Sequence, residues 1–435
     1  MPKRAFGAAA VVGAAALLMS ACGGSSPSSP ATSAATSTTT DAAAGSATTT
    51  AAPVRDANVD LVIWCDNDRA TVLQKYADEF GQEQGIKVQV QVSTDPRKDF
   101  KDATAVGKGP DVLVGAHDWL GELVQNGTVS PVNLSSDQQA QFEKNTLDAA
   151  KYNGQLYGVP YATENLGLMR NTALAPDAPA SMEDLLAKGK AMVADGKATN
   201  ALLNQVGKTG EAYYSYPYLK AFGGGIFAQT PDGGYDPTKV IVGSEGSVKG
   251  AAYMGQLGKD GILSTNIDFD QAQTLFSSGK VPYYITGPWA VEKAKGAGIK
   301  YAISPLPTIE GNKMSPFLGV QMFYVSAKAK NAAFAQEFVT NYVMKPELQV
   351  ALFEVGHRPP ALKAAYEQVS GNDPDVKSWY EAGVGALPMP NIPAMNAVWG
   401  PLGQATADVV AQKSPAAERM AAAQSEIVAN IAKNG

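Results

Sequence analysis

Residues 60–115 alternate between strand-like and helix-like segments, and this order restricts the fold more than any other feature of the chain. The run DLVIWC (60–65) is continuously apolar, as in a strand that is covered on both faces. Residues 70–85 keep helical spacing and end in glycine, and IKVQVQV (86–92) alternates apolar with polar residues. A further helical segment and the strand DVLVG (111–115) follow. This β-α-β-α-β order predicts an α/β fold with a largely parallel sheet.

The alternation continues beyond this segment, which indicates more than one α/β unit. Residues 156–171 have extended character, and residues 181–196 keep the spacing of a helix. A strand, a turn and a helix are predicted over 281–295, and another buried strand over 318–326. The C-terminal part is mostly helical around a loop at 387–399. The 435 residues exceed one ordinary domain, so we expect two α/β lobes.

The N-terminus has the pattern of an export signal. A short basic start precedes residues 5–19, an apolar stretch that is too short to span a membrane. The following LMSAC (18–22) resembles a bacterial lipoprotein signal, which implies cleavage before Cys22 and a diacylglyceryl thioether on its sulfur. A simple secretory signal is the alternative, because lipoprotein signals prefer leucine where this chain has Met19.

We therefore expect a signal peptide at 1–21, and a lipidated cysteine with a disordered tether at 22–57. The tether is rich in Gly, Ser, Thr, Ala and Pro and carries too little apolar surface to fold. Acyl chains on Cys22 would anchor the protein to the extracytoplasmic face of the bacterial cell membrane without a membrane crossing. Cys65 then has no partner for a disulfide, and we expect it to be a small buried thiol.

Composition excludes several classes of function. The formal net charge of −6, without a basic cluster, argues against nucleic-acid binding. The two histidines, His117 and His357, and the absence of a cysteine cluster leave nothing at zinc-ligand spacing, so no metal and no cofactor are predicted. The motifs GxSxG, HExxH and GxxxxGK(S/T) do not occur in the sequence.

Charged and aromatic residues follow the ends of predicted strands. Asp68 and Arg69 come shortly after the first strand, and Asp118 and Trp119 follow the third. Open α/β sheets bind ligands at the carboxyl ends of their strands. Further aromatic residues gather near other strand ends and turns: Tyr213, Tyr214, Tyr216, Tyr218, Trp289 and Trp399. Rings pack against the apolar face of a pyranose, and charged groups form strong hydrogen bonds with its hydroxyls, so this combination predicts sugar binding. His117 is interpreted as a hydrogen-bonded structural neighbour of these groups.

Several longer motifs resemble one family of sugar receptors. They are LVIWCDNDR, TAVGKGPDVLVGAHD, YNGQLYGVPYATENLGLMRN, GEAYYSYPYLKAFGGG, ITGPWA, SPFLGV and MPNIPAMNAVW. In order and spacing the chain is similar to the maltose/maltodextrin-binding proteins, solute-binding lipoproteins of ATP-binding-cassette sugar importers. The resemblance implies a two-lobe type II periplasmic-binding-protein fold, with a mostly parallel sheet flanked by helices in each lobe and the ligand cleft between the lobes. It also implies a monomeric binding protein, not an enzyme, with a malto-oligosaccharide or related glucoside as ligand and transmembrane permease subunits as partners.

The resemblance also assigns ligand contacts, motif by motif. Asp68 and Asp118 would accept hydrogen bonds from sugar hydroxyls, and Arg69 stands where the family has a lysine. Trp119 would be a stacking surface or a rim residue. The remaining contacts implied are acidic, aromatic or apolar: Glu164, Glu211, Tyr213, Phe269, Trp289, Met389 and Trp399.

Some positions depart from the family pattern. Gly115 stands where the family has a tryptophan, and Trp119 and Gly403 stand where it has arginines. Arg97 and Lys98 replace two acidic residues at the extended edge of the groove. We therefore expect the centre of the site to be retained and its rim to be rebuilt. The ligand stays open among maltose, maltodextrin, cyclodextrin, trehalose and an amino-sugar analogue.

The resemblance places lobe 1 at 58–163 and 319–370, and lobe 2 at 164–318 and 371–435, with a hinge that closes on the ligand. Two other functions remain open at this point. A surface glycoside hydrolase would use a carboxylate pair, either Asp68 with Asp118 or Glu164 with Glu211. A ferric-ion receptor of the same fold would use the adjacent tyrosines Tyr213 and Tyr214. The sequence does not distinguish an import receptor from one that signals.

Overall fold

The structure is a computed structural model that describes residues 52–231 and 234–434, with the side chain of residue 434 excepted. The predicted signal peptide, the lipidation site at Cys22 and most of the tether lie outside the described residues. Within the described ranges, none of the helices combines the length and the apolar character that a membrane crossing requires.

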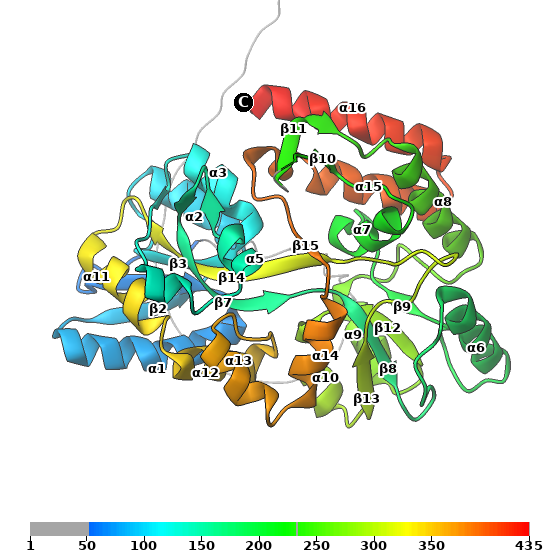
Figure 1. The fold of residues 1–435 in the computed structure, drawn as a ribbon, viewed down its shortest axis with the longest axis horizontal. Coiled ribbons are helices and arrows are strands. Elements are labelled where there is room, and N and C mark those ends of the chain that lie inside the picture. Colours follow the sequence, from blue (N-terminus) through cyan, green and yellow to red (C-terminus); the bar gives the residue numbers. More distant parts are fainter. Residues whose placement is uncertain (1–51, 232–233, 435) are drawn as a thin grey trace, which may run out of the picture. The chain divides into compact units, whose positions relative to one another are not determined.

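The first lobe is built on a seven-stranded sheet (Figure 1). Its main path runs β15 (Leu387–Pro388), β14 (Phe317–Ser326), β3 (Val112–Ala116), β1 (Leu61–Cys65) and β2 (Val88–Val92). Two further strands, β4 (Val129–Ser130) and β7 (Gly158–Glu164), pair with β14. β1 and β14 are buried along their whole length, so the sheet forms the centre of the main hydrophobic core.

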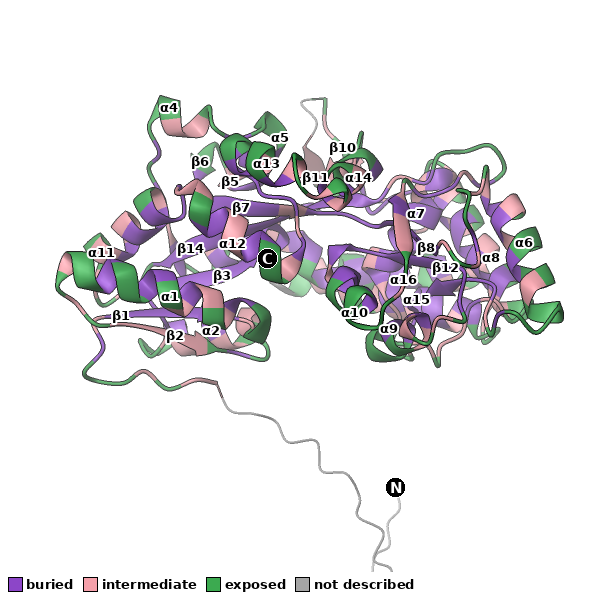
Figure 2. Ribbon diagram, turned by 90° about the horizontal axis from the view of Figure 1, so that it is seen from below, coloured by how far each residue is buried: buried purple, intermediate pink, exposed green. Residues whose placement is uncertain are grey.

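Helices and short turns cover this sheet and expose their outer faces, as Figure 2 shows. The main elements are α1 (Asn67–Gln84), α2 (Pro96–Ala105), η1 (His117–Trp119), α3 (Leu120–Gln125), α5 (Lys144–Ala149), α12 (Pro346–Gly356) and α13 (Lys363–Ser370). The smaller ones are α4 (Ser136–Gln139), β5 (Lys151–Tyr152), β6 (Gln155–Leu156), α11 (Ala332–Glu337) and a π-helical turn, η3 (Phe338–Tyr342).

The second lobe is built on a four-stranded sheet with its own hydrophobic cores. The strand order is β13 (Tyr301–Ser304), β8 (Gly167–Asn171), β12 (Tyr283–Thr286) and β9 (Leu203–Asn204). A separate hairpin pairs β10 (Phe227–Gln229) with β11 (Tyr235–Val240). The helical elements are α6 (Met182–Ala194), α7 (Ala212–Ala221), α8 (Glu245–Lys259), α9 (Phe269–Ser277), η2 (Pro288–Ala290), α10 (Val291–Gly296), α14 (Pro374–Ala382), η4 (Pro393–Ala397), α15 (Trp399–Val410) and α16 (Ala416–Asn434).

The α/β two-lobe class is confirmed, but the expectation of mostly parallel sheets needs correction. In the first sheet β1 is parallel to β2 and β3, whereas β14 is antiparallel to β3, β4 and β7. In the second sheet β8 is antiparallel to both of its neighbours, and the pairing of β12 with β9 is parallel. The reason lies in the connections: β7 leads directly into β8, and β14 brings the chain back in the opposite direction. Figure 1 shows β7 and β14 side by side between the two groups of elements.

The local sequence explains where α1 begins. Asp66 has extended backbone, and its carboxylate accepts a hydrogen bond from the Arg69 backbone N–H, as an N-cap does. Gly85 ends the helix in the left-handed conformation, with φ of 69°. The helix therefore starts three residues before the segment expected from periodicity, and Asp68 and Arg69 lie in its first turn rather than in a loop.

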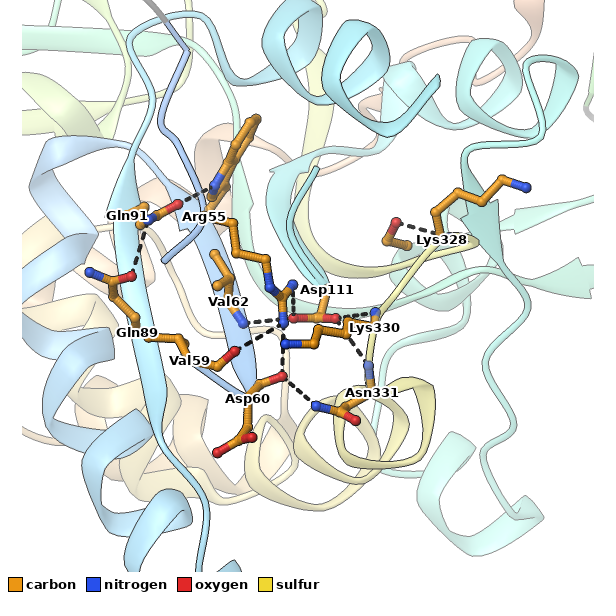
Figure 3. Close-up of polar contacts among 12 residues, drawn as sticks. Arg55, Val59, Asp60, Val62, Gln89, Gln91, Asp111, Lys328, Lys330 and Asn331 are labelled. Atoms are coloured by element: carbon orange, nitrogen blue, oxygen red, sulfur yellow. Dashed lines mark hydrogen bonds and ion pairs between the residues drawn. The ribbon is translucent and has the colours of Figure 1, made fainter. Parts of the chain in front are cut away.

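A buried carboxylate, Asp111, fixes the start of β3 (Figure 3). The turn that carries Asp118 follows the other end of this strand. Asp111 accepts hydrogen bonds from Arg55 Nη1 at 2.6 Å and from the backbone N–H groups of Val62 at 2.8 Å and Lys330 at 2.6 Å. Three separate segments meet at this one side chain, which holds β1, β3 and the segment after β14 in place. This network is structural and lies away from the candidate site.

Candidate functional site

A cavity of about 390 Å³ lies among the ends of strands and helices of both lobes. Lobe 1 contributes side chains that follow β3 and lie in α2, and the end of β7 adds a carboxylate. Lobe 2 contributes aromatic, acidic and amide side chains. The lining residues are Arg97, Asp118, Trp119, Glu164, Gln205, Glu211, Tyr213, Tyr214, Phe269, Trp289, Met389 and Trp399. Hereafter this cavity is called the cleft.

The structure brings together all of the expected contact residues except two. Asp68 is exposed on the first turn of α1 and is not part of the cleft lining. Arg69 is buried, forms an ion pair with Asp66 and lies over the ring of Tyr161 at 5.6 Å from its centre. Because α1 begins at Asn67, the Arg69 side chain packs against the body of lobe 1. The guanidinium is therefore already occupied by protein contacts.

Asp118 is a buried carboxylate, with 5% of its surface exposed, in the 3-10 turn after β3. Burial raises its pKa to about 6, against the lowering effects of Arg97 and of a hydrogen bond with Trp399. Arg97 Nη1 lies 3.9 Å from Asp118 Oδ2. Asp118 can therefore accept hydrogen bonds from a ligand at neutral pH, and it gains a proton in mildly acidic solution.

Glu164 is the second buried carboxylate of the cleft, at the end of β7. Burial alone would raise its pKa, but Arg358 and hydrogen bonds from Arg358 and Gln321 outweigh this effect and lower it. Gln321 Nε2 donates to Glu164 Oε1 at 2.9 Å, and Arg358 lies 5.7 Å from the ring centre of Trp289. Glu164 is therefore held ionised and in a fixed orientation beside an aromatic wall.

That wall is formed by rings from lobe 2. Trp289 Nε1 donates to the Tyr214 hydroxyl at 3.1 Å, and the Tyr213 and Trp289 rings lie 6.2 Å apart. Trp289 also covers Gly287, where a Cβ atom would lie 2.3 Å from the indole. Trp399, at the start of α15, adds a further ring. These contacts fix the rings, so a ligand would meet a preformed surface.

His117 does not line the cleft, but its hydrogen bonds connect segments that surround the cleft. The fully buried ring accepts from the Val320 backbone N–H at Nδ1 over 3.0 Å, and its Nε2 lies 3.1 Å from the Met389 carbonyl oxygen. Burial lowers its pKa to about 4, so the ring is neutral and Nε2–H donates to Met389. His117 thereby joins the turn of Asp118 to β14 and to the segment after β15.

One edge of the cleft is closed by a network around Glu122. Arg97 donates to Glu122 Oε2 at 2.9 Å, and Lys101 donates to Oε1 at 3.0 Å. Asn396, from η4 of the other lobe, donates to the same oxygen at 3.2 Å. The positive residue at 97, which departs from the family pattern, is thus neutralised by acidic neighbours and forms part of a wall.

Three lining residues were not among the sugar contacts expected from the sequence: Arg97, which was placed only at the edge of the groove, Gln205 and Tyr214. Gln205 directly follows β9, and a polar residue after a strand end is the signal that identified Asp118. The strand itself has only two residues, so its pattern was too short to recognise. Tyr214 was grouped with its aromatic neighbours, and only the packing shows which of these rings reach the cleft.

A second, larger cavity of about 830 Å³ is formed by α5, α13 and the segment 383–386. Four of its charged groups form ion pairs: Lys144 with Asp148, and Lys363 with Glu143 at 3.7 Å. The cleft combines buried carboxylates with rings, and for this reason we take the cleft as the candidate site.

Within the described residues, no group of three or more His, Cys, Asp or Glu side chains is arranged to hold a metal ion. Burial raises the pKa of Tyr213 and of Tyr214 well above the ordinary value, which disfavours the phenolate form that iron(III) requires. The side chains of the cleft can form hydrogen bonds and stacking contacts with a polar ligand.

Two α/β lobes joined by crossing strands, with a cleft of this composition between them, define a two-lobe solute-binding receptor. The chain belongs to the bacterial extracellular solute-binding protein family, whose model matches residues 75–382. It is therefore a binding protein and not an enzyme.

The chain is also similar to several characterised proteins. It is 31% identical to the galactooligosaccharide-binding protein of Bacillus subtilis over 82% of this chain and 85% of the relative. It is 28% identical to a maltooligosaccharide ABC transporter solute-binding lipoprotein of Streptococcus pneumoniae, over 82% and 85% of the two chains. It is 27% identical to the maltotriose-binding protein of Pyrococcus abyssi, over 78% and 75%.

Proposed function

We propose that this protein binds a malto-oligosaccharide or a related glucoside in the cleft and delivers it to the permease of an ATP-binding-cassette importer. One observation carries the proposal: Asp118 and Glu164, both buried, share a cavity with the fixed rings of Trp289 and Trp399. Carboxylates accept hydrogen bonds from sugar hydroxyls, and rings cover the apolar face of a pyranose. The names of the relatives, which bind malto- or galacto-oligosaccharides, support the same class of ligand.

The proposed contacts are Asp118, Trp119, Glu164, Glu211, Tyr213, Phe269, Trp289, Met389 and Trp399. Asp68 and Arg69 would take part only through their neighbours or after a change in the lobe positions. We assign lobe 1 to 58–163 and 319–370, and lobe 2 to 164–318 and 371–435, with β15 of the last segment pairing with β14 in the sheet of lobe 1. A ligand that contacts both lobes favours the closed arrangement, which is the form a permease would recognise.

We further propose that the mature protein is a monomer that begins at Cys22 and is anchored to the extracytoplasmic face of the membrane by lipid on that cysteine. The lipoprotein-like motif and the lipoprotein relative of Streptococcus pneumoniae support this assignment. Mass spectrometry of the N-terminal peptide tests it. A Cys22→Ala chain released into the medium is expected, and an unmodified Cys22 in the membrane fraction would contradict it.

The test of the ligand is thermal unfolding of the purified protein with maltose, maltodextrins, cyclodextrin, trehalose, galacto-oligosaccharides and iron(III). A ligand at a hundred times its Kd should add about 2.7 kcal/mol to the free energy of unfolding. Stabilisation by α-1,4-glucans supports the proposal. Stabilisation by galacto-oligosaccharides alone, by iron(III) alone, or by no member of the panel would overturn it.

A further inference from the structure

Gln205 is a buried residue of the cleft lining, and its side-chain oxygen has no partner among the described residues. It lines the cleft with only 4% of its surface exposed, and its side-chain oxygen Oε1 has no hydrogen-bond partner among the described residues. Buried polar atoms are nearly always paired, and an exception calls for a specific explanation. An absent ligand that supplies the missing hydrogen bond would explain it.

The backbone around Gln205 is held on both sides. Asn204 pairs with Ile285 of β12, and its side chain donates to the Gln205 carbonyl oxygen at 3.0 Å. On the other side, the N–H groups of Val206 and Gly207 both donate to the Ile267 carbonyl at 2.9 Å. The amide is therefore presented to the cleft from a fixed backbone, which is the requirement for selective recognition.

An amide offers chemistry that the neighbouring acids lack. Ionised Asp118 and Glu164 only accept hydrogen bonds, whereas a glutamine accepts through Oε1 and donates through Nε2. Two adjacent sugar hydroxyls can satisfy both atoms, one as donor and the other as acceptor. Whether both hydroxyls reach the amide depends on their axial or equatorial orientation.

We propose that Gln205 is a specificity-determining residue that binds a pair of neighbouring hydroxyls and distinguishes gluco- from galacto-configured rings. This inference rests on the proposed function, because it takes the ligand to be an oligosaccharide. It adds a residue to the cleft that neither the sequence motifs nor the comparisons assign.

The experiment is isothermal titration calorimetry of the wild type and Gln205→Met with maltotriose and a galacto-oligosaccharide of the same length. Methionine keeps the shape of the side chain and removes its hydrogen bonds. We expect the affinity for the preferred sugar to fall about tenfold and the ratio between the two sugars to move toward one. Gln273→Met is the matched control: this glutamine of α9 is buried but does not line the cleft, and its substitution should leave the ratio unchanged.

The thermal stability of the Gln205 variants shows whether this residue contacts the ligand or has a structural role. Because the Gln205 amide oxygen has no partner within the described part of the chain, Gln205→Met should unfold at the same temperature as the wild type or higher. Gln205→Asn shortens the side chain by one methylene group and should show the same loss of affinity. This variant replaces Gln205→Met in the experiment if the methionine variant does not fold. An unchanged ratio in variants that bind sugar would overturn the inference. Failure of the wild type to bind any sugar would instead overturn the proposed function.

Discussion

The indole ring of Trp119 lies directly over the α-carbon of Gly115. A Cβ atom at residue 115 would lie 2.1 Å from Cζ3 of this ring, so any side chain there would displace it. In the family that the sequence resembles, a tryptophan stands at the position of Gly115 and an arginine at the position of Trp119. A side chain at residue 115 and the observed position of the Trp119 ring therefore exclude each other, so the glycine and the tryptophan depend on each other.

Gly115→Ala is expected to displace Trp119 and to lower the free energy of unfolding by about 1–3 kcal/mol, the usual cost of overpacking. The double variant Gly115→Ala/Trp119→Ala should regain stability without regaining sugar affinity. Denaturant unfolding and calorimetry measure both effects. Gly296→Ala, where a Cβ would meet no atom within 4 Å, is the control. A Gly115→Ala protein with wild-type stability and affinity would refute the coupling.

Sugar affinity should fall as the pH drops from about 7 to about 5. Burial raises the pKa of Asp118 to about 6, and protonation removes the charge that strengthens its hydrogen bonds to sugar hydroxyls. Asp118→Asn should bind about ten- to a hundredfold more weakly and lose this pH dependence, because a charge-assisted bond contributes about 1.5–3 kcal/mol. Calorimetry across this pH interval is the measurement. Equal slopes for the two proteins would count against the assignment.

His117→Gln should lower the free energy of unfolding by about 1–3 kcal/mol, because the Val320 N–H or the Met389 carbonyl loses its buried partner. The pH dependence of this loss of stability is a more specific test of the role of His117. The pKa of His117 is lowered from 6.5 to about 4, so between these values the unfolded chain binds a proton that the folded protein does not. This group therefore loses its stabilising contribution as the pH falls from about 6.5 to about 4.

Asp118 has the opposite effect on the pH dependence of the free energy of unfolding. Its raised pKa lets the folded protein keep a proton up to about pH 6, so its contribution to stability rises as the pH falls. In the wild type, the contributions of His117 and Asp118 to the pH dependence of the free energy of unfolding oppose each other. His117→Gln removes the His117 contribution and leaves those of the other titrating groups in place, so the stability deficit of the variant should shrink on acidification from pH 6.5 to 4. Urea unfolding at several pH values measures this difference. A deficit that is constant or grows on acidification would contradict the neutral, buried state of His117.

Arg97→Ala should shift the preference of the cleft toward longer glucans. Arg97 lines one edge of the cleft and donates to Glu122 behind it, and removal of the guanidinium opens that edge. We expect the affinity for maltoheptaose relative to maltose to rise about tenfold, which corresponds to about 1.4 kcal/mol. Lys98→Ala is the control, because Lys98 is exposed and pairs with Asp102. The same length profile in both variants would exclude Arg97 as a determinant of ligand length.

Much of the fold could be predicted from local patterns. β1 and α1 follow from an apolar run and from helical spacing, since burial of apolar side chains acts on neighbours along the chain. Motif resemblance identified most of the residues that line the cleft. It also named Asp68 and Arg69, which do not line the cleft in this structure, because the cap at Asp66 starts α1 early and Arg69 lies over Tyr161.

The sequence by itself determined the class of the fold, the family and most of the residue types of the cleft, because these depend on local pattern and motif order. Only the tertiary structure decided which groups share an environment. It placed the Trp119 ring over Gly115, left the Gln205 oxygen unpaired and raised the pKa of Asp118 by burial. These properties depend on how side chains pack in three dimensions and on the loss of solvent around buried groups, and the pattern of residue types along the chain specifies neither.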